Sequence, residues 1–213
     1  MDLERIQKTA AALSARNMEA FCAETSEEAV ALLQSFLREG DSVGHGGSVT
    51  LSELGVPELL KNGPYVYLDR DACQTPEERE ACMRSILNAD VFLTSANAIT
   101  EDGVLYNVDG NGNRVAALCY GPKRVIVIAG TNKIVKDLPE AVRRVKTKAA
   151  PLNGVRLQTS TYCAVQNKCV AVEGAPCDGC GGTARMCCDY VATGYQRDPE
   201  RLKVILVNAP LGY

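Results

Sequence analysis

The sequence has no tryptophan, a single histidine and few aromatic residues, which make up 5% of its 213 residues. Proteins that bind single-stranded nucleic acids stack bases on aromatic side chains, and proteins that bind duplexes usually carry a basic face. Here the formal net charge is −3, and no basic run is present. We therefore expect no nucleic-acid partner.

Long apolar runs are also missing. No stretch approaches the roughly 18–20 apolar residues that span a bilayer. The first residues, MDLERIQKTA, lack the basic and then apolar layout of a signal peptide. These absences predict a cytoplasmic protein with no membrane partner. The apolar content of 46% is ordinary for a globular chain, so we expect a single domain over residues 1–213.

Cysteine, by contrast, is abundant, with ten residues in the chain. In a reducing compartment these residues should be thiols or metal ligands rather than disulfides. Six of them gather near the C-terminus: Cys163, Cys169, Cys177, Cys180, Cys187 and Cys188. We expect residues 160–197 to form a cysteine-rich, metal-binding segment.

The spacing Cys177-x-x-Cys180 closes a small chelate loop. Zinc would use four ligands at tetrahedral angles, and a four-iron cluster would use up to four thiolates. Neighbouring glycines let backbone amides approach cluster sulfurs, which favours an iron–sulfur cluster of the [4Fe-4S] type. Zinc is the alternative metal, and a redox dithiol at these two cysteines is a third interpretation.

Two apolar runs, Val91–Thr94 and Arg124–Ala129, have the composition of strands that are buried on both faces of a parallel sheet. Helical patterns alternate with such runs along the chain, as at Glu27–Leu37 and Leu138–Ala149. Further short strands are expected at Asn17–Cys22, Asp41–Val43, Tyr65–Leu68 and Arg201–Asn208. The alternation predicts an α/β fold, with a mostly parallel sheet and helices on both of its faces.

A glycine-rich loop follows the strand predicted at Asp41–Val43, and either Thr50 or Ser52 is expected to cap the next helix. Such a turn presents free backbone N–H groups to an anion. We therefore assign Gly46, Gly47 and Ser48 to phosphate or carboxylate binding; the alternative is a tight turn that needs glycines for geometry alone. His45 is flanked by glycines in the same loop and is a candidate catalytic residue, with a structural role as the alternative.

The passage between Val91–Thr94 and Arg124–Ala129, with the turn after it, is rich in polar residues. In an open α/β sheet, ligands bind beyond the carboxyl ends of the strands. The candidate ligand-binding residues there are Asn97, Asn107, Asp109, Asn113, Arg114 and Lys133. Glu101 and Asp102 are candidates for a catalytic base or nucleophile, and the alternative is that Asp102-Gly103 only makes a tight hairpin turn.

Several stretches together resemble the LUD family, the lactate-utilisation-protein domain: GHGGSVTLSELG, TSANAITEDGVLYNVDGNGNRVAALCYGPKRVIVIAGTNKIV, TYCAVQNKC with the later cysteines, and VILVNAPLGY. The resemblance covers essentially the whole chain. It implies the fold of ribose-5-phosphate isomerase, glucosamine-6-phosphate deaminase and CoA transferases, a Rossmann-like three-layer sandwich. It also implies a link to lactate oxidation beside an iron–sulfur redox partner protein, and a fold that is often homo-oligomeric.

Cysteine-bearing members of that family show the pattern Cys-x5-Cys-x2-Cys-x6-Cys. In this chain, Cys163-x5-Cys169 and Cys180-x6-Cys187 match the outer spacings, whereas the middle carries the insertion VAVEGAPCDG with the extra Cys177. We choose Cys163, Cys177, Cys180 and Cys187 as the metal ligands, with Cys169 as the next candidate.

Three hypotheses for function follow. The first is an iron–sulfur protein, an oxidoreductase or a lyase, in the redox metabolism of a small hydroxy or keto acid such as lactate. The second is a non-redox isomerase, lyase or transferase that acts on a phosphorylated or CoA-linked molecule, in which the metal is structural and Lys133 or Arg114 neutralises the anion. The third is a non-catalytic sensor or assembly subunit. The first two require a small anionic metabolite.

Overall fold

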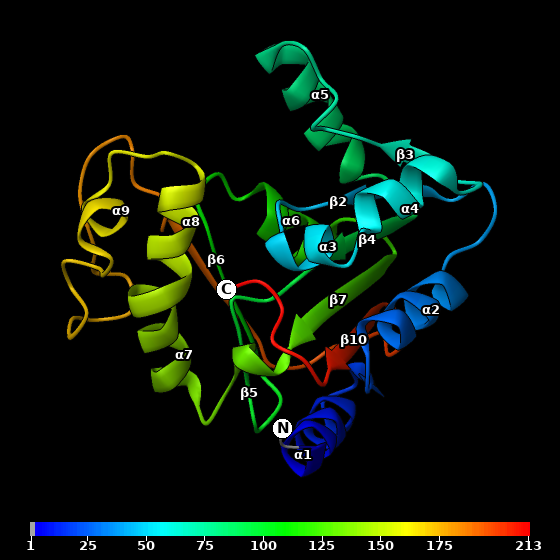
Figure 1. Cartoon of the computed structure of the whole chain (residues 1–213), viewed down its shortest axis with the longest axis horizontal. Coiled ribbons are helices and arrows are strands. Elements are labelled where there is room, and N and C mark those ends of the chain that lie inside the picture. Colours follow the sequence, from blue (N-terminus) through cyan, green and yellow to red (C-terminus); the bar gives the residue numbers. More distant parts are fainter. Residues whose placement is uncertain (1–2) are drawn as a thin grey trace.

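The main element of the fold is a parallel sheet of six strands (Figure 1). The computed structural model describes residues 3–213. The strands lie in the order β1-β10-β7-β4-β2-β3, and every neighbouring pair is parallel. Their bounds are Glu19–Ala23 (β1), Ser42–His45 (β2), Val66–Leu68 (β3), Val91–Thr94 (β4), Arg124–Gly130 (β7) and Leu202–Val207 (β10). The predicted α/β class with a mostly parallel sheet is confirmed.

Helices cover both faces of this sheet. Side chains along β7 alternate between two cores: Val125 and Val127 face one core, while Ile126 and Ile128 face the other. Because successive side chains of a strand point to opposite faces, a strand that is covered on both sides is apolar throughout. The first core is closed by α1 (Leu3–Ala15), α6 (Asn113–Tyr120) and the end of α5 (Pro76–Ile86), and the second by α2 (Ser26–Phe36), α3 (Val49–Glu53) and α4 (Val56–Asn62).

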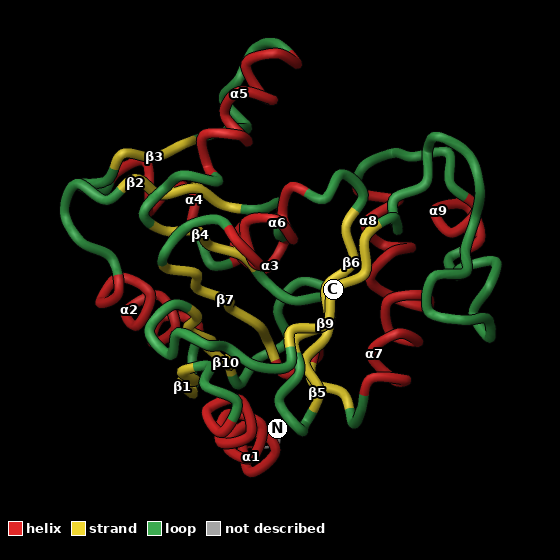
Figure 2. The backbone as a smooth tube through the Cα atoms, turned by 180° about the vertical axis from the view of Figure 1, so that it is seen from behind, coloured by secondary structure: helices red, strands yellow, loops and turns green. Residues whose placement is uncertain are grey.

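A second, smaller sheet was not predicted. Its four strands lie in the order β8-β5-β6-β9, and their bounds are Ile134–Val135 (β8), Ala98–Thr100 (β5), Leu105–Asp109 (β6) and Asp189–Thr193 (β9). The β5–β6 and β6–β9 pairs are antiparallel. Figure 2 shows β5, β6 and β9 running beside the main sheet. The polar passage after β4 therefore supplies two strands of this sheet, β5 and β6, before it forms helix α6.

The helix predicted at Leu138–Ala149 continues further than expected. It begins as α7 (Leu138–Arg144), passes through a π-helical segment (Val145–Ala149) and ends as α8 (Ala150–Arg156). A short helix, α9 (Tyr162–Gln166), opens the cysteine-rich segment, and Figure 1 places it next to α8. Within residues 3–213, no helix combines the length and apolar character that crossing a bilayer requires.

Strand β2 is longer than predicted and includes His45. Its Gly44 is needed because the end of α5 packs directly on the strand: a Cβ at this position would lie 2.5 Å from Cγ1 of Ile86. Ser48, rather than the expected Thr50 or Ser52, caps α3 by accepting a hydrogen bond from the Leu51 amide. The glycine loop is thus shorter than the sequence suggested, and it begins only after His45.

Helix α5 projects from the body of the molecule (Figure 1). Its first turn is stabilised by a capping box, in which the Thr75 hydroxyl accepts from the Glu78 amide while the Glu78 carboxylate accepts from backbone N–H groups. Only Ile86, at its far end, is buried. The helix therefore has a free side that can border a cleft.

Candidate functional site

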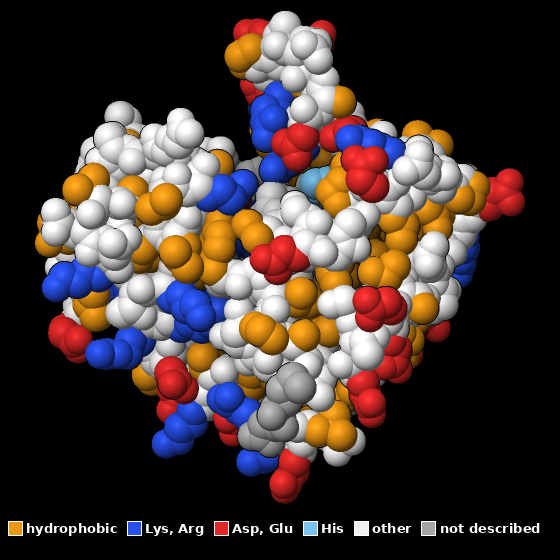
Figure 3. All heavy atoms as spheres, viewed as in Figure 1, with side chains coloured by type: hydrophobic (Ala, Val, Ile, Leu, Met, Phe, Trp, Pro, Cys, Tyr) orange, Lys and Arg blue, Asp and Glu red, His pale blue; other side chains and the backbone are white. Residues whose placement is uncertain are grey.

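A cleft of about 540 Å³ lies at the carboxyl ends of the main strands. Residues that follow four of these strands line it: Gly47 after β2, Arg70 after β3, Ser95 after β4 and Lys133 after β7. This is the position at which open α/β sheets bind their ligands. In Figure 3, Lys and Arg side chains gather around the hollow at the base of α5.

Most of the predicted ligand-binding residues meet in this cleft. Those that line it are Gly47, Ser48, Asn97, Asp109, Asn113, Arg114 and Lys133. Gly46 and Asn107 lie directly behind the wall: a Cβ on Gly46 would be 2.9 Å from Cδ of Arg114, and Oδ1 of Asn107 accepts from Nη1 of Arg114 at 2.6 Å. The residues predicted from the sequence therefore form one wall of the cleft.

Arg114 organises that wall. Its Nη2 donates to Oδ1 of Asn97 at 2.9 Å and to the Val108 carbonyl at 2.8 Å. Its Nε lies 3.4 Å from Oδ1 of Asp109, and the Asp109 carboxylate also accepts from the Arg114 amide. Burial lowers the pKa of Arg114. Because its donors are already engaged, Arg114 holds the polar side chains in place rather than offering a free guanidinium to a ligand.

Four arginines that were not predicted line the same cleft: Arg70, Arg79, Arg156 and Arg185. Nε of Arg70 is buried and has no hydrogen-bond partner within residues 3–213. Burial lowers the pKa of Arg70, and the nearby Arg79 and Arg156 lower it further against the opposing effect of Asp71. Asp71 contacts two of these cations, at 3.0 Å from Arg79 and 3.6 Å from Arg70. One carboxylate thus serves two guanidinium groups.

Arg156 is held at the rim by the C-terminal residue. Its Nε donates to the Tyr213 hydroxyl at 2.8 Å, and its Nη2 donates to Oδ1 of Asn153 at 2.8 Å. The Tyr213 hydroxyl in turn donates to Oδ1 of Asn153 at 2.9 Å. These neutral partners orient the guanidinium without neutralising it. Although the chain is acidic overall, the cleft is therefore strongly positive.

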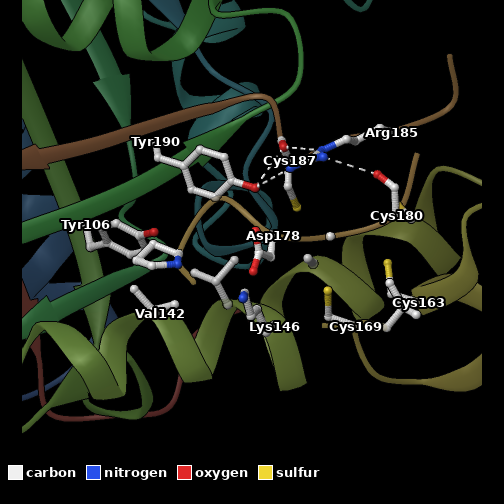
Figure 4. Close-up of a pocket in the computed structure, with 15 residues that line it drawn as sticks. Tyr106, Val142, Lys146, Cys163, Cys169, Asp178, Cys180, Arg185, Cys187 and Tyr190 are labelled. Carbon is white, nitrogen blue, oxygen red and sulfur yellow. Dashed lines mark hydrogen bonds between the residues drawn. The ribbon is translucent and has the colours of Figure 1, made fainter. Parts of the chain in front are cut away.

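A second, small pocket lies within the cysteine-rich segment (Figure 4). Four thiols line it: Cys163, Cys169, Cys180 and Cys187. Burial, together with the other three thiols, raises the pKa of Cys187 to about 12. Cys177, which we had chosen as a ligand in place of Cys169, is exposed and does not line the pocket.

The potential metal donors that line this pocket are the four thiols and the Asp178 carboxylate, with no histidine. Within residues 3–213, no three Cys, His, Asp or Glu side chains are close enough together to share one metal ion. Zinc binds its sulfurs at about 2.3 Å and so requires them to be nearly in contact. In a four-iron cluster each thiolate binds a different iron, so the thiols stand further apart. The four thiols of the pocket are not close enough together to share one zinc ion, and they are the side chains that could bind a cluster.

Two cations fix the backbone around this pocket. Nε of Arg185 donates to the Cys187 carbonyl at 2.7 Å, and its Nη1 donates to the Cys180 carbonyl at 3.2 Å, as Figure 4 shows. Nζ of Lys146, in the π-helical segment, donates to the carbonyls of Ala171 (2.7 Å) and Ala175 (2.7 Å). The segment has little regular structure, and these charge-assisted hydrogen bonds satisfy backbone carbonyls that a helix or sheet would otherwise pair.

A family model for the LUD domain matches residues 6–207. The chain belongs to the LUD domain family. A solved DUF162 family protein from Deinococcus radiodurans is similar at 13% identity and a TM-score of 0.53, over 97% of this chain and 98% of the other. This likeness agrees with the predicted fold. No curated protein matches the chain.

More distant similarities to solved structures are also found. For eIF2B beta from Chaetomium thermophilum, the identity is 18% and the TM-score 0.36, over 54% of this chain and 44% of the other. For ribose 5-phosphate isomerase A from Methanocaldococcus jannaschii, the identity is 16% and the TM-score 0.33, over 66% and 58%.

The LUD domain places the predicted catalytic acids outside the cleft. Glu101 and Asp102 occupy the turn between β5 and β6. Glu101 accepts from Nε of Arg5, in α1, at 2.7 Å, and Asp102 accepts from Nη2 of Arg16, the residue after α1, at 2.9 Å. Gly103 supplies the positive φ of +89° that this turn requires. The turn interpretation of Asp102-Gly103 therefore holds, and the catalytic assignment of both acids is withdrawn.

His45 is also placed differently from the expectation. It is buried at the end of β2, its Nε2 lies 2.6 Å from the Tyr67 hydroxyl, and its Nδ1 lies 2.8 Å from the Gly46 carbonyl. Burial lowers the pKa of His45. Both ring nitrogens are engaged and the ring does not line the cleft, so its catalytic assignment is withdrawn in favour of the structural alternative.

The two pockets of this LUD domain share a wall. Residues 183–186 line the cleft and lie in the chain between Cys180 and Cys187, which line the thiol pocket. Arg185 lines both. Of the four arginines that were not predicted, only Arg70 carried a sequence signal, because it lies two residues after a predicted strand. Arg79, Arg156 and Arg185 belong to helical or irregular segments, in which no local pattern identifies a ligand-binding side chain.

Proposed function

We propose that this LUD domain binds a small anionic metabolite in the cleft and acts on it beside an iron–sulfur cluster, in the redox metabolism of a hydroxy or keto acid such as lactate. The observation that carries the proposal is the position of the cation-lined cleft against a pocket of four thiols, with residues 183–186 as the wall between them.

The cleft supports the anion. Guanidinium groups bind carboxylate and phosphate through paired, charge-assisted hydrogen bonds. Nε of Arg70 is buried and makes no hydrogen bond in residues 3–213, and its ion-pair partner, Oδ1 of Asp71, lies 3.6 Å away; a buried donor without a hydrogen bond costs about 1–3 kcal/mol. An anionic ligand that accepts this hydrogen bond would recover that free energy. Ser48 and Gly47 lie on the same side of the cleft and offer further polar contacts.

The thiol pocket is the observation that supports an iron–sulfur cluster in this proposal. Cys163, Cys169, Cys180 and Cys187 would hold it, and they retain both outer spacings of the family pattern, x5 and x6. Such a cluster supplies electron transfer or, where one iron is open to a ligand, a Lewis acid. In the first role the domain needs an iron–sulfur redox partner protein to carry the electrons onward.

A second candidate is a non-redox isomerase, lyase or transferase that acts on a phosphorylated or CoA-linked molecule. The number of cations favours it: Arg70, Arg79 and Arg156, of which the first two share the one carboxylate of Asp71, together exceed what a single carboxylate ligand requires, whereas a phosphate uses several guanidinium groups. In this case the metal of the cysteine-rich segment, an iron–sulfur cluster or zinc, is structural.

Anion binding is tested by calorimetric titration of the full chain with inorganic phosphate, pyruvate and lactate. The test variant is Arg79→Gln, and its matched control on the same helix is Arg84→Gln, because Arg84 is exposed, pairs with Glu80 and does not line the cleft. Loss of one charge-assisted hydrogen bond should weaken binding about tenfold or more in the test variant. Equal binding by wild type and both variants would remove the cleft from the proposal.

The metal is tested by anaerobic purification, an absorption spectrum and analysis of iron, sulfide and zinc. About four irons and four sulfides per chain are expected. Cys169→Ser should lose most of the metal, whereas Cys177→Ser and Cys188→Ser should keep it because both thiols are exposed outside the pocket. Loss of metal in Cys177→Ser, with retention in Cys169→Ser, would instead support Cys177 as the fourth ligand, as predicted from the sequence. About one zinc per chain would favour the second candidate.

A further inference from the structure

Lys133 lies in the floor of the cleft, in the turn that follows β7. Its side chain is buried, with the residue only 4% exposed. Nζ donates to the Thr50 hydroxyl at 2.8 Å and to the Ser95 hydroxyl at 2.9 Å. Within residues 3–213, no carboxylate forms an ion pair with it. A buried lysine without a counterion is unusual, and it calls for a chemical explanation.

The surroundings of Lys133 favour the neutral amine. Burial, aided by the cations Arg144 and Arg114 and opposed by Glu53, lowers the pKa of Lys133 to about 7. Near neutral pH, a substantial fraction of Lys133 is therefore uncharged. A lysine that is desolvated beside other cations is the form in which enzymes use lysine as a nucleophile.

The hydrogen bonds also leave the reactive electron pair available. The Thr50 hydroxyl donates to the Leu211 carbonyl, so it must accept its hydrogen bond from Lys133. If the Ser95 hydroxyl accepts as well, both N–H bonds of a neutral amine are engaged. The lone pair then has neither hydroxyl as a partner, and the cleft that Lys133 lines is the space into which a ligand can enter.

We propose that Lys133 is a reacting amine, which forms an imine with a small aldehyde or ketone whose carboxylate or phosphate is bound by Arg70, Arg79 and Arg156. The inference rests on the proposed anion site and adds the reacting group of the substrate, a carbonyl. The nitrogen lone pair forms the C–N bond while the C=O π electrons move to oxygen, which takes up a proton. Loss of this oxygen as water, and of the nitrogen's proton, then gives the C=N bond.

The Ser95 hydroxyl is the positioning group for this sequence. It lies within hydrogen-bond distance of Nζ and itself lines the cleft. It can therefore pass a proton between the nitrogen and the carbonyl oxygen without moving. No oxidant or reductant is needed, because imine formation is a condensation that releases one water molecule.

The experiment traps the imine with borohydride. The full chain is incubated with pyruvate or with dihydroxyacetone phosphate, reduced and analysed by intact mass and peptide mapping. We expect one reduced adduct per chain, located on Lys133. Lys133→Arg keeps the positive charge but cannot form a stable imine, so its adduct should fall at least tenfold. Lys136→Arg is the matched control, because Lys136 is exposed three residues away, and it should label like the wild type.

A Lys133→Met variant checked by circular dichroism covers the case in which arginine does not fit the buried site. Adduct spread over exposed lysines, or undiminished in either Lys133 variant, would overturn the proposal. The separate titration with phosphate tells the two failures apart. If phosphate binds and Lys133 is not labelled, the imine proposal falls and the anion site stands; if phosphate does not bind and no adduct forms, both fall.

Discussion

Replacing Lys133 with methionine should change how the stability of the protein depends on pH. The pKa of Lys133 is lowered from 10.5 to about 7 in the folded chain. The unfolded chain therefore holds this proton across a range in which the folded chain has released it. Stability rises with pH wherever the unfolded state binds more protons. The destabilisation by Lys133 is thus complete below about pH 7 and is gone above about pH 10.5.

The size of the effect follows from the same shift. At about 1.4 kcal/mol per pKa unit, the full penalty is about 5 kcal/mol, and linkage gives a gain of about 3 kcal/mol in the free energy of unfolding between about pH 7 and about pH 9.5. Lys133→Met removes this titration. It also deprives the Ser95 and Thr50 hydroxyls of one partner, at a cost of about 1 kcal/mol. The variant should therefore be the more stable protein at pH 7 and lose that advantage in alkaline solution.

The assay is urea denaturation of both proteins at several pH values, in which the difference between the two free energies of unfolding is plotted against pH. Cysteines and tyrosines also titrate in this range, but they are present in both proteins and cancel in the difference. Lys136→Met, at an exposed position, should run parallel to the wild type. Parallel curves for Lys133→Met and the wild type would show that Lys133 is charged in the folded protein, and the reasoning would fail.

Three further variants separate structural from ligand-binding roles. His45→Ala should lower the free energy of unfolding by about 2–3 kcal/mol, since it empties a buried site and leaves polar partners unpaired; chemical denaturation measures this, and an unchanged midpoint would contradict it. In Gly47→Ala the new Cβ would lie 2.7 Å from Nη2 of Arg70, so the Arg70 side chain would have to move away. Calorimetry should then show a severalfold lower phosphate affinity, while the free energy of unfolding changes by less than about 1 kcal/mol. Glu101→Gln combined with Asp102→Asn should leave phosphate affinity unchanged, and a clear loss would return these acids to the site.

The main sheet could be predicted because its strands are buried on both faces. Val91–Thr94 and Arg124–Gly130 are apolar at nearly every position, which is a signal that the sequence states directly. The second sheet gave no such signal. Its strands Ala98–Thr100 and Ile134–Val135 are short, and Leu105–Asp109 is interrupted by polar residues that serve the cleft. Short strands of mixed polarity are stabilised by their neighbours in space, and these neighbours cannot be identified from the local sequence.

The candidate site divides in a similar way. Residues that follow a predicted strand, such as Ser48, Asn97 and Lys133, could be placed at the crevice by topology alone. Arg156 could not, because it is positioned by a helix that continues through a π-helical segment and by the C-terminal Tyr213. His45 was misplaced for a related reason: the glycines beside it indicated a loop, whereas Gly44 serves the close packing of Ile86 on β2.

Both ends of the cysteine-rich segment are anchored to regular elements, whereas its middle is irregular. The segment starts on α9, next to α8, and ends on β9, which pairs with β6 in the second sheet. Between these anchors the chain passes the four thiols and then contributes residues 183–186 to the cleft. A group bound to the thiols would order the same backbone that faces the anion, because metal binding at such a site is also folding free energy. If the proposed cluster and anion both bind, we therefore expect their binding to be mutually dependent, because residues 183–186 lie between the two pockets.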